Sequence, residues 1–124
     1  MSESPVMSET PVSPADLPNR RFMETTATSF GEGNANGYCV SFGRFDDGAP
    51  SEIFISANKA SSDAESIARD AAIILSKALQ YGAPIADIKS AVTRDATGRA
   101  ASIIGHAVDL VVAAADAGEE GKEP

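Results

Sequence analysis

The sequence predicts an α+β fold: a small antiparallel sheet of about three strands, followed by three helices that pack on one face of it. Two observations lead to this prediction. Between Tyr38 and Ala57 apolar residues recur at every second position, whereas from Ser62 to Leu79 they recur at every third or fourth. In addition, the strand-like segments all precede the helix-like ones, an order typical of helices that cover one face of an antiparallel sheet.

Three segments have the composition or the alternation of β-strands. Segment 22–30 is rich in threonine and has phenylalanine at both ends, which favours a strand. In segments 38–45 and 52–56 the large apolar residues alternate, so that each strand buries one face against a core. Cys39 falls on the opposite, more polar face. The residues expected to point inward are Tyr38, Val40, Phe42, Ile53 and Ile55.

Two turns separate these strands. The glycine- and asparagine-rich stretch 31–37 is interpreted as a turn, because a phosphate-binding loop would open into a helix and here a strand follows. The stretch 46–50 is the second turn. Its acidic pair, Asp46 and Asp47, is assigned to the turn, because a hard cation needs more oxygen ligands in a defined spacing.

The long helix begins at a capping box. In Ser62-Asp63-Ala64-Glu65 the serine hydroxyl and the glutamate three residues later can each satisfy a free backbone N–H. An apolar stripe follows at helical spacing, and its alanines suit close packing across the sheet or against a second copy. The stripe comprises Ala64, Ile67, Ala68, Ala71, Ala72, Leu75, Ala78 and Leu79.

Two further helices complete the fold. Gly82 ends the long helix and Pro84 begins a short one. After a break at Thr97-Gly98, a last helix is expected over about 101–115. The inward residues of the short helix are expected to be Ile85, Ile88 and Val92.

The length and composition allow one small domain. The chain has 124 residues, of which 43% are hydrophobic. Residues 1–16 are rich in Ser, Glu and Pro, and residues 118–124 are charged and contain glycine, so both tails are expected to be disordered. Their apolar area does not offset about 1 to 2 kcal/mol of ordering entropy per residue. The folded domain is then 17–117.

Charge and hydropathy exclude several classes of partner. The net charge is −8 and the basic residues are scattered, which argues against direct binding to nucleic acid or to an anionic membrane. No apolar run approaches the roughly 20 residues that span a bilayer. The N-terminus lacks a secretory signal, and the single Cys39 excludes an internal disulfide, so we expect a cytoplasmic protein.

No set of residues forms a catalytic or metal site in the sequence. Cys39 and His106 are too few for a zinc site within one subunit, and nothing near Cys39 marks it as an activated nucleophile. His106 is interpreted as a buried, hydrogen-bonded or edge histidine. We therefore expect no catalytic residues, no metal and no cofactor. The aspartates expected to be solvated charges or caps are Asp63, Asp70, Asp87, Asp95 and Asp109.

Several stretches together resemble one known family. The principal ones are 38–48 (YCVSFGRFDDG), 52–55 (EIFI), 59–62 (KASS) and 68–72 (ARDAA), followed by 78–84 (ALQYGAP), 94–98 (RDATG) and 104–110 (IGHAVDL). This pattern is similar to the TSCPD domain, which occurs at the C-terminus of many ribonucleotide reductases, notably adenosylcobalamin-dependent ones, and as short free-standing bacterial and phage proteins. The likeness covers about 17–112 and is closest to the short forms.

One departure from the family bears on function. The family is named for a motif with a cysteine before the long helix, and the corresponding stretch here, 60–64, contains none. A redox or metal role is therefore not carried over. Nor can the chain reduce ribonucleotides alone, because reductases of this kind need a radical-bearing cysteine, a reducing cysteine pair and a large barrel.

The resemblance implies a non-catalytic accessory module, linked to ribonucleotide reductase and so to deoxynucleotide supply, that binds a reductase chain or a nucleotide. A nucleotide would meet Lys59 and Arg69, together with Ser61 and Ser62, at the strand-to-helix junction where free N–H groups lie. The other available phosphate partners are Arg94 and Arg99.

The alternative is a self-associating structural or interaction protein without a reductase link. A sheet of three strands leaves two edges exposed, and exposed edges pair readily. The sheet edge and the alanine stripe would then form the contact. We expect a homodimer for the same reason.

Overall fold

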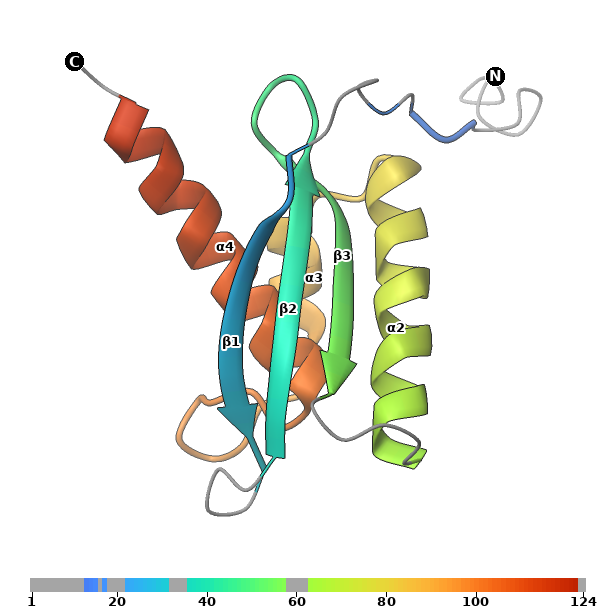
Figure 1. Ribbon diagram of the computed structural model, residues 1–124, viewed down its shortest axis with the longest axis vertical. Coiled ribbons are helices and arrows are strands. Elements are labelled where there is room, and N and C mark those ends of the chain that lie inside the picture. Colours follow the sequence, from blue (N-terminus) through green and yellow to red (C-terminus); the bar gives the residue numbers. More distant parts are fainter. Residues whose placement is uncertain (1–12, 16, 18–21, 32–35, 58–62, 123–124) are drawn as a thin grey trace, which may run out of the picture.

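A computed structural model of the chain describes residues 13–15, 17, 22–31, 36–57 and 63–122. In these residues an antiparallel sheet of three strands precedes three helices, which confirms the α+β prediction (Figure 1). The elements are β1 (Glu24–Phe30), β2 (Asn36–Arg44), β3 (Pro50–Ala57), α2 (Asp63–Gln80), α3 (Ile85–Ala91) and α4 (Ile103–Lys122). None of the helices described is long and apolar enough to cross a membrane.

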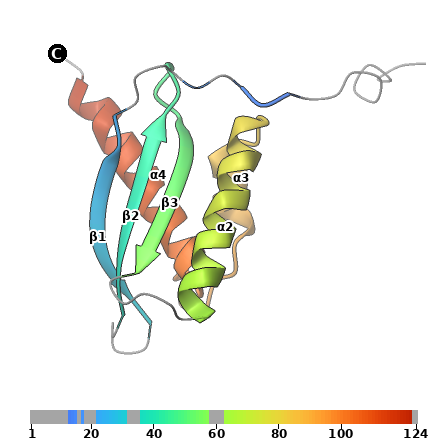
Figure 2. The ribbon, with the colours of Figure 1, turned by 45° about the vertical axis from the view of Figure 1, so that its right-hand side comes forward.

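The sheet has the strand order β1-β2-β3, and its register aligns Thr26 with Val40 and Val40 with Ile55. α3 and α4 lie behind the sheet and α2 lies along the side of β3 (Figures 1 and 2). All the described helices therefore cover one face and one edge. The other face, which we call the open face, and the far edge of β1 are not covered by any described helix or strand.

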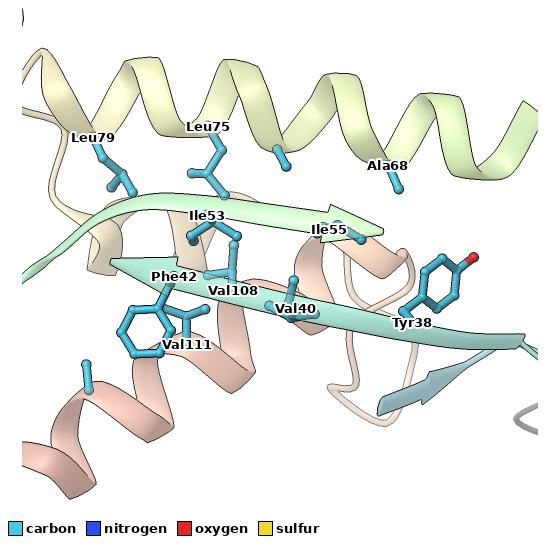
Figure 3. Packing of buried hydrophobic residues seen from close by; sticks show 13 residues of the cluster. Tyr38, Val40, Phe42, Ile53, Ile55, Ala68, Leu75, Leu79, Val108 and Val111 are labelled. Carbon is cyan, nitrogen blue, oxygen red and sulfur yellow. The ribbon is translucent and has the colours of Figure 1, made fainter. Parts of the chain in front are cut away.

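The core lies between the sheet and the helices α2 and α4. Leu75 and Leu79 reach Ile53 from one side, and Val108 and Val111 pack beneath the sheet near Phe42 (Figure 3). The inward positions predicted for the strands are confirmed, since all five expected residues are buried. The buried cluster is Tyr38, Val40, Phe42, Ile53, Ile55, Ala68, Ala72, Leu75, Leu79, Ala107, Val108, Val111 and Ala115.

The apolar stripe of α2 is wider than the face that the helix buries. Ala68 and Ala72 are 1% exposed, whereas Ile67, in the same stripe, is 68% exposed. The two alanines let the helix approach the sheet closely, so this part of the stripe is not available to a second copy. The reason is geometric. α2 lies beside one strand, so a smaller part of its circumference is buried than in a helix that is covered from two sides.

The predicted helix boundaries hold at one junction and fail at another. α2 ends at Gln80, Gly82 has a positive φ of 104°, and α3 follows Pro84, as expected. The expected end of the last helix near Ala115 is wrong, because α4 continues to Lys122 and so enters the stretch 118–124. No proline stands between Ala115 and Lys122, so nothing in this stretch forces the helix to end.

Candidate functional site

α2 closes the free edge of β3 with side chains. Ser76 Oγ accepts a hydrogen bond from Ile53 N–H at 2.8 Å and donates one to Ile53 C=O at 2.9 Å. Towards either end of the strand, Gln80 Nε2 donates to Ser51 C=O at 3.3 Å and Ala57 N–H donates to Glu65 Oε2 at 3.5 Å. The helix therefore takes the place of a fourth strand. Part of its outer surface lies next to the open face.

A hollow of about 350 Å³ lies between α2 and the open face of the sheet. Cys39, Phe54 and Ser56 form its floor, because they alternate with the core residues and so point away from the core. Arg69 and Ile73 form its wall on α2. Phe54 and Ile73 are each 47% exposed, so both present apolar surface at the hollow.

The charge at this hollow is largely compensated. Arg69 Nη2 donates to Glu65 Oε2 at 2.8 Å, four residues earlier in the helix. The Glu65 side chain is only 9% exposed, whereas that of Arg69 is 58% exposed. The guanidinium is thus held by a nearly buried carboxylate, which leaves a mainly apolar surface for a ligand.

Of the residues predicted to bind a ligand at the strand-to-helix junction, only Arg69 lies within the described residues. Lys59, Ser61 and Ser62 lie outside the described residues. The first turn of α2 carries Asp63 and Glu65, which suits the helix dipole but opposes a bound phosphate. The described part of the junction is therefore poorly suited to an anion.

Arg94 has a structural role. It forms two hydrogen bonds of 2.8 Å with Asp109 and one of 3.0 Å with the Lys89 carbonyl oxygen. Lys89 Nζ also donates to Asp109 at 2.9 Å. The expectation that Asp109 is a solvated charge or cap is wrong, because it ties α4 to the end of α3 and to the loop that follows.

This network shifts the titration of both partners. The hydrogen bond from Arg94, assisted by Lys89, lowers the pKa of Asp109 from 3.8 to about 2, although partial burial opposes the shift. The same hydrogen bond raises the pKa of Arg94. Asp109 is therefore ionised at neutral pH, and the guanidinium of Arg94 is bonded to this carboxylate rather than being available to a phosphate.

Cys39 and His106 cannot act as a pair. His106 lies on the core side of the sheet, where its Nε2 is 2.9 Å from Thr28 Oγ1 and its ring packs 5.3 Å from that of Phe30. Cys39 faces the opposite side and is partly exposed. The sheet separates the two, which confirms the interpretation of His106 as a packed, hydrogen-bonded histidine.

Within the described residues, no group of three or more His, Cys, Asp or Glu side chains could hold a metal ion. Comparison with known proteins gave no match to a family model, to a curated protein or to a solved structure. A functional proposal therefore rests on the sequence resemblance and on the surfaces of the chain.

The sequence patterns did not predict this hollow. Two signals could have indicated it: Phe54 stands at a position where the alternation puts a polar face, and Ile73 lies outside the apolar stripe of α2. The ion pair between Arg69 and Glu65 could also have been predicted from the sequence, since a spacing of four residues brings opposite charges together on a helix.

Proposed function

We propose that the chain is a TSCPD-type accessory module linked to ribonucleotide reductase, and so to deoxynucleotide supply, and that it acts in the cytoplasm by binding a reductase chain. The resemblance over 17–112 supports the link to the reductase. The α+β fold, with helices on one side of a small sheet, offers an open face for such a contact.

The observation that most supports a protein partner is the apolar character of the hollow. Its exposed side chains, Phe54 and Ile73, suit an apolar side chain of the partner, and its cation, Arg69, is already paired. Asp70 is exposed beside Arg69 and the chain has a net charge of −8. A matching reductase segment would therefore carry an apolar anchor next to basic residues.

Nucleotide binding is the other form of this proposal. It would depend on Lys59, Ser61 and Ser62 together with Arg69. Because Arg69 is paired with Glu65 and the first turn of α2 is acidic, the described residues favour the protein partner. Catalysis by the purified chain is not expected in either form, since it has a single cysteine, Cys39.

The test is titration calorimetry of the full chain against the large reductase subunit from the same cell. Ile73→Glu should weaken binding about tenfold or more, because it places a charge in a desolvated apolar contact. Ile67→Glu is the matched control: it adds the same charge to an exposed isoleucine of α2 that does not line the hollow. It should change the affinity by less than about threefold.

Absence of binding to the reductase chain, or equal losses in the two variants, would overturn the protein-partner form. Saturable binding of a nucleotide that disappears in Lys59→Ala would instead support the nucleotide form. Circular dichroism of each variant checks that α2 remains folded.

A further inference from the structure

Among the described residues, β1 is an edge strand without the usual protection against pairing. It runs for seven residues in continuous register with β2, and its sequence contains neither proline nor lysine. In the part of the chain that the structure describes, no strand pairs with its far side. Natural edge strands are commonly blocked by such residues, by bulges or by a covering element, so this edge is a template for another strand.

The hydrogen-bonding groups that face outward can be assigned from the register. Ile53 bonds to Ser76, so its N–H and C=O point away from β2, and its pair with Phe42 is of the non-hydrogen-bonded kind. The groups of Phe42 then point towards Glu24 of β1. By alternation, the outward groups on β1 belong to Thr25, Ala27 and Ser29.

The charge of this edge is compatible with pairing to a second copy of the chain. A net charge of −8 makes two copies repel over most of their surface. In β1, however, the charged residue is Glu24, which is paired with Arg44 through bonds of 2.6 Å and 3.2 Å. Two β1 strands can therefore meet without an uncompensated charge on either.

We propose that two copies pair through β1 in antiparallel orientation, about a twofold axis at Ala27, and form one continuous sheet. Because Ala27 is the middle residue of β1, this axis lets the two strands overlap along their whole length. Thr25 of each copy then bonds to Ser29 of the other, and Thr26 lies opposite Thr28. Glu24 lies opposite Phe30, so no like charges face one another. This interface is separate from the hollow and does not depend on the link to the reductase.

Sedimentation equilibrium of the full chain, with and without charges at the twofold axis, tests the proposal. The wild type should be a dimer. Ala27→Lys and Ala27→Glu each place like charges directly opposite one another, and each should raise the dimer dissociation constant about tenfold or more. An equimolar mixture of the two variants should recover the dimer, because opposite charges then meet, and the recovery should weaken with added salt.

Ala113→Lys is the matched control, because it adds the same charge at an exposed position of α4. It should dimerise as the wild type does. A monomeric wild type, charged variants as dimeric as the control, or a mixture that stays monomeric would each overturn the proposal. The mixture also separates a lost interface from a misfolded variant, since a misfolded chain would not regain its partner.

Discussion

Ser76 of α2 gives Ile53 of β3 both of the hydrogen bonds that a neighbouring strand would supply, at 2.8 Å and 2.9 Å. One side chain thus satisfies an N–H and a C=O at the edge of the sheet, in a place where Ile53 is fully buried and Ser76 is 6% exposed. This contact closes the edge of β3 to other chains, whereas among the described residues no strand pairs with the far edge of β1.

Replacing Ser76 with alanine should lower the free energy of unfolding by about 1 to 3 kcal/mol, because the buried N–H and C=O of Ile53 lose their bonds to α2. Urea denaturation measures the change. Ser90→Ala is the control, since the exposed Ser90 donates a hydrogen bond to the carbonyl oxygen of Ala86 in its own helix; the variant should lower the free energy of unfolding by less than about 0.5 kcal/mol. Equal losses would mean that Ser76 does not close the edge.

Replacing Ile53 with alanine should lower the free energy of unfolding by about 3 kcal/mol, because Ile53 is 0% exposed and lies between the side chains of α2 and α4. Thermal and urea unfolding provide the measurement. Ile74→Ala removes the same atoms from a side chain that is 69% exposed, and should lower the free energy of unfolding by less than about 1 kcal/mol. A small effect at Ile53 would contradict the position of the core.

Asp109→Asn should destabilise the protein by about 1 to 2 kcal/mol at pH 6, since Asp109 has a pKa of about 2 in the folded chain and an ordinary value of 3.8. A lowered folded-state pKa stabilises the protein above the ordinary value, and this contribution is lost as the pH falls through the folded value. The difference between wild type and variant should therefore shrink between about pH 4 and pH 2.

Urea unfolding at several pH values in this range measures that difference. Asp87→Asn, at an exposed position of α3, serves as the control and should behave as the wild type does. A difference at Asp109 that does not depend on pH would mean that the carboxylate charge is not what stabilises the contact.

Gly105→Ala should destabilise the protein by about 1 kcal/mol, although alanine favours a helix by a similar amount. The added Cβ would lie 3.2 Å from Ala100 Cβ and 3.3 Å from Val92 Cγ2, both close to the backbone and unable to move away easily. Ala113→Gly, at an exposed position of the same helix, measures the intrinsic preference. A gain in stability in Gly105→Ala would show that the loop with Val92 and Ala100 packs less tightly against α4 than the structure indicates.

Much of the fold was predictable because its causes are local. Inward positions such as Val40 and Ile53 follow from a two-residue period, and the boundary between α2 and α3 follows from Gly82 and Pro84. The candidate site was harder to predict from the sequence. Arg69 was singled out as a ligand-binding residue, but the hollow that it lines together with Cys39 was not predicted, because the hollow exists only once α2 lies against β3. Its pairing with Glu65 follows from a spacing of four residues within one helix and could have been predicted.

The sequence by itself determined which segments are strands and helices and which of their faces are apolar, because side-chain periodicity and capping act between near neighbours. Only the tertiary structure decided which sheet edge is closed and that Asp109 holds Arg94. The first depends on a contact between residues 23 positions apart and the second on one 15 apart. Such contacts require the helices to be docked in one particular place, which no local pattern specifies.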